Sequence, residues 1–128
     1  MKNNTHLLKY LKFHNIIICK SELENLSKVK NLIEKNKLIR KARNCVINAI
    51  SELAKNCLYG NIPLKTCDFK KLSKYKYILR QLSKPTSIKT RKNLLIQKGG
   101  FLLNLLIPAA LTFLAPILQK YLKRKFNK

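Results

Sequence analysis

Acidic residues are scarce in this sequence: five Asp and Glu stand against 28 Lys and Arg among 128 residues, and the formal net charge is +23. A surplus of this size goes well beyond what solubility requires, and it indicates a polyanion or an anionic surface as the partner. Nucleic acid and anionic membrane are therefore the two classes to consider. The imbalance is strongest in the second half of the chain, where Asp68 is the sole acidic residue.

Glycine and histidine are also rare. The three glycines, Gly60, Gly99 and Gly100, form no glycine-rich phosphate loop of the Walker or dinucleotide type. Two histidines and five scattered carboxylates offer no evident acid–base or nucleophilic pair, so we expect no enzyme activity.

Cysteine is present but is not arranged in CxxC pairs. The four cysteines are Cys19, Cys45, Cys57 and Cys67. Their wide spacing argues against a zinc site, and we expect buried, small apolar side chains in a reducing compartment, with no metal or cofactor. The short apolar run at residues 16–19 is too brief for a secretory signal, and none is expected.

The apolar residues recur at three- and four-residue intervals along nearly the whole chain, without strand-like alternation, which predicts an all-α fold. Helices are expected at residues 5–13, from 21 to about 33, and at 38–59, 66–83, 87–97 and 101–118. Their predicted apolar faces are Leu23, Leu26 and Ile33; Leu38, Ala42, Cys45, Val46, Ala49, Ile50, Leu53 and Cys57; and Leu72, Tyr75, Leu79 and Leu82. We expect a small basic helical bundle at residues 1–98, a diglycine joint at 99–100, and a hydrophobic tail with a basic end at 101–128.

Short motifs mark several helix ends. Ser21 and Glu24 have the spacing of a capping box, in which each side chain satisfies a free amide of the first turn. Gly60 is suited to close the longest helix in the left-handed conformation. Ser87 follows Pro85 and is expected to cap the last basic helix.

The basic helices favour nucleic-acid binding. Lys outnumbers Arg, and Lys neutralises phosphates without reading base edges, so we expect non-specific binding to double-stranded DNA. The predicted contacts are Lys70, Lys71, Lys74, Lys76, Arg80, Lys89, Arg91 and Lys92. The simpler alternative is that these side chains form the solvated face of a small bundle. Tyr10, Tyr75 and Tyr77 are candidates for stacking on single-stranded bases, although tyrosines at helical spacing are more often core residues.

Residues 101–118 form an uncharged segment of 18 residues. As a helix it would span roughly 27 Å at about 1.5 Å per residue, close to the thickness of a bilayer core. Three interpretations remain: a bilayer-inserting segment, a helix that docks into a groove of a viral or host protein, and a buried core helix. The predicted membrane contacts are Phe101, Leu102, Leu105, Leu106, Ile107, Leu111, Phe113 and Leu114.

Three motifs in one order carry a family resemblance. They are residues 60–64 (GNIPL), 71–76 (KLSKYK) and 97–102 (QKGGFL). In this order they resemble short open reading frames of adintoviruses and related Polinton (Maverick) elements, over most of the chain from about Arg43 onward. The junction at residues 98–108 also resembles the precursor of adenovirus core peptide X, or mu, in which a Gly-Gly cleavage site separates a basic segment from a Leu/Ile/Pro/Ala-rich tail.

The resemblance implies a minor virion component that condenses or tethers the DNA genome. It further implies a precursor with a cleavage site formed by Gly99, Gly100 and Phe101. A viral cysteine protease would cut this site after Gly100. Such a protein would be found in the virion, and in the host nucleus during expression. The residues after Gly100 would then supply association with membrane lipid or with a capsid protein. The competing hypothesis is a membrane-active or membrane-anchored basic protein that uses residues 101–118 to reach lipid.

Overall fold

The computed structural model describes residues 14–126 apart from 61 and 63, and at several positions near its C-terminal end it describes the backbone alone. All regular structure in these residues is helical, which confirms the all-α prediction. The helices are α2 (His14–Ile18), α3 (Lys20–Lys28), α4 (Leu32–Lys41), α5 (Asn44–Leu58), α6 (Thr66–Ser73), α7 (Lys76–Ser83), α8 (Ile88–Lys98) and α9 (Gly100–Phe126). The helix predicted at residues 5–13 lies outside the described residues.

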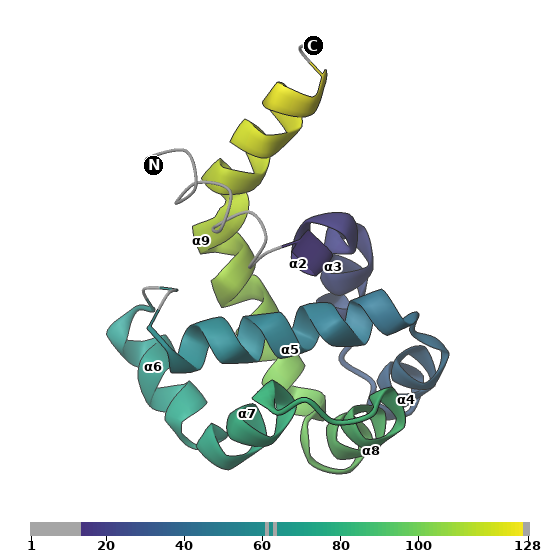
Figure 1. The fold of residues 1–128 in the computed structure, drawn as a ribbon. Helices are drawn as coiled ribbons and strands as arrows, with labels where there is room; N and C mark the ends of the chain where they lie inside the picture. The colour runs from purple at the N-terminus through teal and green to yellow at the C-terminus, as the bar shows by residue number, and fades with distance from the viewer. Residues whose placement is uncertain (1–13, 61, 63, 127–128) are drawn as a thin grey trace.

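Helix α5 is the centre of the fold. It runs across the molecule, with α6 and α7 below one end, α4 and α8 near the other, and α2 and α3 above (Figure 1). Its apolar positions recur at helical spacing, and Ile47, Ile50 and Leu53 are fully buried. At its end Gly60 has φ +72°, so the predicted left-handed closure is confirmed.

The helix predicted at residues 38–59 is two helices, because Ala42 and Arg43 are extended between α4 and α5. The prediction of one helix was wrong since neither glycine nor proline marks the break. Leu38 is 43% exposed rather than part of the buried face. The break is stabilised by Lys92, whose Nζ donates hydrogen bonds of 2.8 Å to the backbone oxygens of Arg40 and Ala42. These bonds satisfy carbonyl groups that are free where α4 ends.

The predicted capping box at Ser21 is also wrong. Helix α3 begins one residue earlier, at Lys20, and its N-cap makes no side-chain hydrogen bond. A cap occurs instead at Asn31, whose Oδ1 accepts hydrogen bonds from the amides of Ile33 and Glu34 and starts α4. The helix predicted from residue 21 to about residue 33 therefore ends at Lys28, and a separate helix begins at Leu32. Ile33 is 70% exposed, although it was predicted to be buried.

The helix predicted at residues 66–83 is likewise two short helices, α6 and α7, with a turn at Lys74 and Tyr75. Its predicted apolar stripe is nevertheless largely correct, since Leu72, Leu79 and Leu82 are buried in the core. The predicted cap at Ser87 is confirmed: its Oγ accepts a hydrogen bond from the Thr90 amide at 3.1 Å.

Helix α9 passes behind α5 and extends beyond the other helices (Figure 1). Its first turns pack against α3, α5 and α6. Five of its side chains are completely buried in the same hydrophobic cluster as the side chains of α5: Leu102, Leu103, Leu106, Ile107 and Ala110. Over these turns the hydrophobic segment is a core helix, one of the three interpretations that the sequence left open.

Candidate nucleic-acid interface

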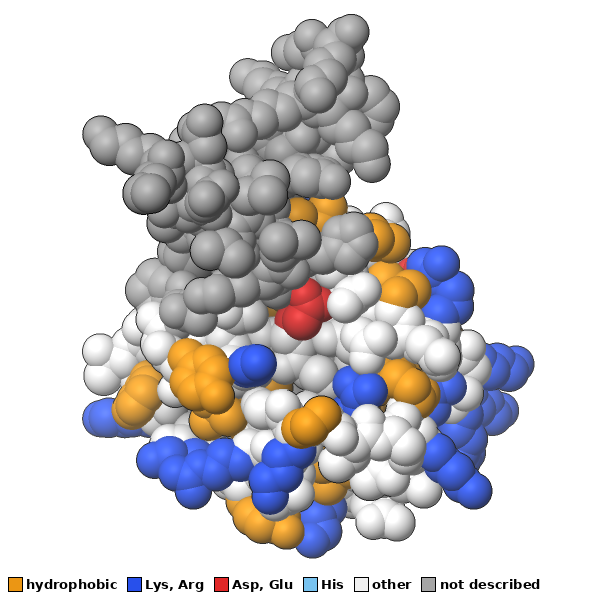
Figure 2. Space-filling model, viewed as in Figure 1, with side chains coloured by type: hydrophobic (Ala, Val, Ile, Leu, Met, Phe, Trp, Pro, Cys, Tyr) orange, Lys and Arg blue, Asp and Glu red, His pale blue; other side chains and the backbone are white. Residues whose placement is uncertain are grey.

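Six of the eight predicted DNA contacts are exposed. They are Lys70, Lys71, Lys74, Lys76, Arg80 and Lys89. Helices α6, α7 and α8 carry five of them, and Lys74 lies in the turn between α6 and α7. Helix α7 packs on α5 and α8, and all three helices lie below α5 in Figure 1. Figure 2 shows basic side chains around the lower half of the molecule, with few acidic side chains between them. An extended basic surface suits a polyanion better than a small anion.

The other two predicted contacts are engaged inside the fold. Arg91 is partly buried, and its guanidinium donates to Ser51 Oγ at 2.7 Å. Burial lowers the pKa of Arg91 from its ordinary value. Lys92 holds the end of α4, as described above. These two cations stabilise helix contacts in the described structure, and phosphate binding would compete with those hydrogen bonds.

Further exposed cations lie outside the predicted set. They are Lys28, Lys30, Lys37, Arg40, Lys41, Lys55, Lys65, Lys84 and Lys98. Ion pairing neutralises little of this charge. In the part of the chain that the structure describes, two ion pairs occur: Lys20 with Glu24 at 3.6 Å, and Arg43 with Glu22. The first is exposed and contributes little to stability.

Exposed aromatic side chains occur in the same stretch of sequence as the basic helices. Tyr59, Phe69 and Tyr77 are each more than 60% exposed. Tyr75, the other tyrosine in this region, is half-buried and packs against the core. Tyr77 therefore keeps the stacking capacity predicted for it, whereas Tyr10 lies outside the described residues.

The diglycine sequence forms a buried corner. Helices α8 and α9 meet there at an angle of 103°. A Cβ atom on Gly99 would lie 3.0 Å from the Leu95 Cα atom, and one on Gly100 would lie 2.8 Å from a Leu32 methyl carbon. Gly99 is therefore needed for close packing against backbone, whereas the Leu32 side chain can move away from Gly100. The diglycine joint predicted from the sequence is a buried, bent corner.

A buried lysine outside the predicted site residues stabilises this corner. Lys35 is completely buried, and its Nζ donates to the Gly100 carbonyl oxygen at 3.1 Å and to Asn104 Oδ1. Burial lowers the pKa of Lys35 from its ordinary value. The signal in the sequence is its spacing, because Lys35 lies one helical turn before the buried Ile39.

The predicted membrane contacts divide by burial. Leu102, Leu106 and Ile107 are fully buried, Leu105 and Leu111 are half-buried, and Phe101 is 59% exposed. The side chains of Phe113 and Leu114 lie outside the described part. None of the described helices is by itself long and apolar enough to cross a bilayer; α8 and residues 100–112 together reach that length and hydropathy, but as a sharply bent pair.

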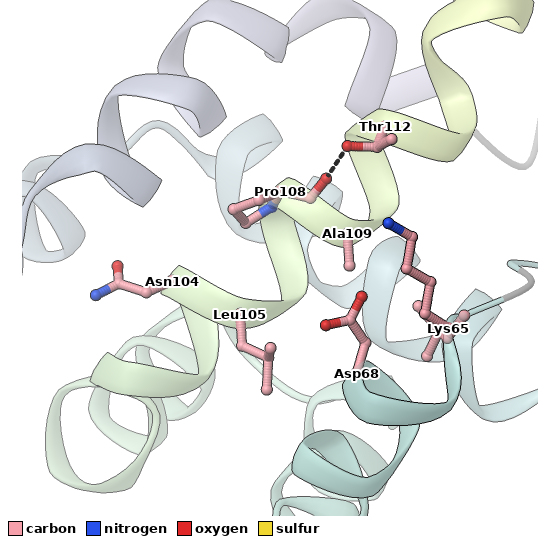
Figure 3. Close-up of a pocket in the computed structure, with 8 residues that line it drawn as sticks. Lys65, Asp68, Asn104, Leu105, Pro108, Ala109 and Thr112 are labelled. Atoms are coloured by element: carbon pink, nitrogen blue, oxygen red, sulfur yellow. Dashed lines mark hydrogen bonds between the residues drawn. The ribbon is translucent and has the colours of Figure 1, made fainter.

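A shallow cleft of about 450 Å³ lies between α6 and the middle of α9 (Figure 3). Its lining includes Lys65, Asp68, Asn104 and Pro108. Pro108 lacks an amide hydrogen, so it cannot make the usual bond to the carbonyl of Asn104. Thr112 Oγ1 donates to the Pro108 carbonyl at 2.8 Å instead of facing a ligand. One carboxylate and one amine line this cleft, and no histidine or cysteine is among its lining residues.

No protein-family model, curated protein or solved structure matches this chain.

Proposed function

We propose that this protein is a minor virion component of an adenovirus-like DNA virus or a Polinton element, and that it binds double-stranded DNA without sequence preference. The observation that carries the proposal is the set of six exposed cations on α6, α7, α8 and the turn between α6 and α7. None of them forms an ion pair with the carboxylates of the described residues. Their charge is free to act on an external polyanion.

The mechanism is phosphate neutralisation. Each ammonium or guanidinium group that approaches a phosphate releases condensed counterions, and this release supplies most of the affinity of a non-specific DNA-binding protein. Five of the six exposed groups are lysines, which act as point charges and do not read the bidentate pattern of a guanine. Side chains of all three helices, including Leu72, Leu79 and Leu95, belong to one hydrophobic core, which fixes the helices that carry these charges.

Cleavage after Gly100 belongs to the same proposal, as an expectation from the family resemblance. Proteases bind their substrates as extended chain, whereas Gly99 and Gly100 are buried at the corner between α8 and α9. Processing therefore requires the corner to open, which includes releasing the Lys35 hydrogen bond to Gly100. Cleavage would then free α9 from its covalent link to the basic helices.

The direct test is replacement of the six exposed cations by glutamine. The DNA-binding variant changes Lys70, Lys71, Lys74, Lys76, Arg80 and Lys89, and the control variant changes Lys28, Lys30, Lys37, Arg40, Lys41 and Lys55, which lie outside α6, α7 and α8. Both lose the same charge at exposed positions. Fluorescence anisotropy with a labelled duplex should show a loss of affinity of at least tenfold more in the first variant than in the second. Equal losses would show that total charge, and not this surface, binds DNA.

Membrane association is the second candidate function. The observation in its favour is that α8 and the first turns of α9 reach, as a bent pair, the length and hydropathy of a membrane span. Against it, Leu102, Leu106 and Ile107 are buried in the core, so they reach lipid only if α9 leaves the bundle. Leakage of anionic vesicles that is unchanged by excess duplex DNA would favour this function over DNA binding.

A further inference from the structure

Two cysteines that are far apart in the sequence meet at the corner between α2 and α3. Cys19 lies between these helices, and Cys45 is the second residue of α5. Their sulfur atoms are 2.9 Å apart. Because the sulfur atoms of a disulfide are about 2.05 Å apart, the two thiols need to move by less than about 1 Å to form a bond.

The surrounding contacts hold this geometry without a covalent bond. The Cys19 amide donates to the Asn15 carbonyl at 3.0 Å, and the Cys19 carbonyl accepts from the Leu23 amide at 2.9 Å. An ion pair between Arg43 and Glu22 joins α3 to the residue that precedes α5. The two backbone segments are therefore fixed on each other before any reaction of the thiols.

The other cysteines do not share this arrangement. Cys57 is half-buried, Cys67 is exposed, and neither has a sulfur contact in the described residues. Metal binding does not account for the thiol pair either, since no third ligand joins it to form a candidate metal site in the part of the chain that the structure describes. The close contact of Cys19 and Cys45 thus points to the chemistry of a dithiol.

We propose that Cys19 and Cys45 are a redox-active pair that forms an intramolecular disulfide by exchange with an oxidised low-molecular-weight disulfide. The Cys45 thiol loses its proton, and its thiolate attacks one sulfur of that reagent, whose S–S bond breaks and releases one thiolate. Cys19 then loses its proton and attacks Cys45 Sγ, and the second thiolate of the reagent leaves. Two electrons and two protons pass to the reagent, which ends as two thiols.

The environments of the two thiols set the order of attack. Cys45 is partly exposed in the first turn of α5, so a reagent in solution can reach its sulfur. Cys19 is completely buried. Burial, together with the neighbouring Cys45, raises the pKa of Cys19 to about 12. Cys45 is accordingly the attacking thiol, and Cys19 is the thiol that resolves the mixed disulfide.

The bond would secure the hydrophobic helix inside the fold. Helix α3 and helix α5 both pack against α9, and the disulfide links the residue before α3 to the first turn of α5. Chain closure over 26 positions also restricts the unfolded state. The oxidised protein should therefore hold α9, and with it the corner at Gly100, more firmly than the reduced protein.

The test uses the full chain in buffers of reduced and oxidised glutathione. After alkylation and digestion, mass spectrometry should find the peptides of Cys19 and Cys45 joined, with loss of two hydrogens. Thermal unfolding should show a rise in Tm of roughly 10 °C on oxidation. Replacing either residue by serine should abolish both effects, whereas the double variant Cys57→Ser, Cys67→Ser should keep both.

The double variant also guards against a folding defect at the buried Cys19. It retains only the proposed pair, so titration with a thiol reagent should find two free thiols in the reduced protein and none after oxidation. Two thiols that remain free at a high ratio of oxidised to reduced glutathione would overturn the proposal. A cross-link to Cys57 or Cys67 in the native protein, or between two chains, would overturn it equally.

Discussion

Burial changes the protonation of one acidic residue, Glu52. Glu52 lies on the central helix α5 with much of its carboxylate buried, and its Oε2 has no hydrogen-bond partner among the described residues. Burial raises its pKa from 4.5 to about 7, and hydrogen bonds from Asn15 only partly oppose this effect. The folded protein therefore binds a proton at Glu52 more tightly than the unfolded chain does.

This difference predicts how stability depends on pH. Glu52 should destabilise the fold increasingly as pH rises from about 4.5 to about 7, because the unfolded chain releases its proton first. Glu52→Gln should flatten this part of the profile, and above pH 7 it should be more stable than the native protein by about 2 kcal/mol. Urea unfolding between pH 4.5 and 8 measures the effect. Parallel profiles for the two proteins would show that Glu52 is not the titrating group.

The two corner glycines should differ when replaced by alanine. At Gly99 the new methyl group meets the backbone Cα of Leu95, which cannot move aside, so we expect a loss of about 1–3 kcal/mol. At Gly100 it meets the end of the Leu32 side chain, which is 41% exposed and can rotate, so the loss should be below about 1 kcal/mol. Chemical denaturation distinguishes them, and equal losses would contradict the described corner.

Local sequence signals predicted two residues at helix ends correctly, although the capping box expected at Ser21 is absent. Gly60 and Ser87 act at helix ends through their own backbone or hydroxyl group, and both were predicted from the sequence. The buried Lys35 and the contact of Cys19 with Cys45 depend on residues 65 and 26 positions away, respectively. No local pattern encodes such distant partners.

At the scale of helices, periodicity predicted where apolar faces lie better than where helices end. The stripes of α5 and α7 are buried as expected, but the breaks at residues 42–43 and 74–75 were missed. Neither break contains glycine or proline. Both breaks lie where the chain turns to pack its helices against the core. Helix propensity depends on local sequence, so it does not predict such breaks.

Helix α9 gives the clearest prediction at this scale. Leu106 is fully buried in the core, whereas Phe101 on the same helix is 59% exposed. Leu106→Ala should lower the free energy of unfolding by about 2–5 kcal/mol, because it removes buried methyl groups and leaves a cavity. Phe101→Ala should change it by less than about 1 kcal/mol. A large effect of Phe101 with a small effect of Leu106 would mean that the other face of α9 is buried.

The core position of α9 also governs how the protein is best dissected. A chain that ends at Gly100 would lack five fully buried side chains, among them Leu102, Leu103 and Ile107. Loss of DNA binding by such a chain would report unfolding rather than a missing contact. Point substitutions of exposed cations on α6, α7 and α8 leave the core intact, so they test DNA contacts directly.

At the scale of the whole molecule, a net charge of +23 coexists with a continuous hydrophobic core. The core fixes the helices, and mutual repulsion of the cations opposes folding, so an anionic partner should stabilise the native state. Charge and the all-α fold were both evident from the sequence. The burial of the hydrophobic segment was not, because composition alone does not distinguish a core helix from one that enters a membrane.

The salt dependence of duplex DNA binding tests the central claim most directly. For the full chain, the logarithm of affinity should fall linearly with the logarithm of salt concentration, with a slope of about −5 if the six exposed cations each neutralise a phosphate. Two duplexes of unrelated sequence should give the same slope and affinities within about threefold. A flat salt profile, or affinities that differ more than tenfold between the two sequences, would contradict non-specific phosphate binding by this surface.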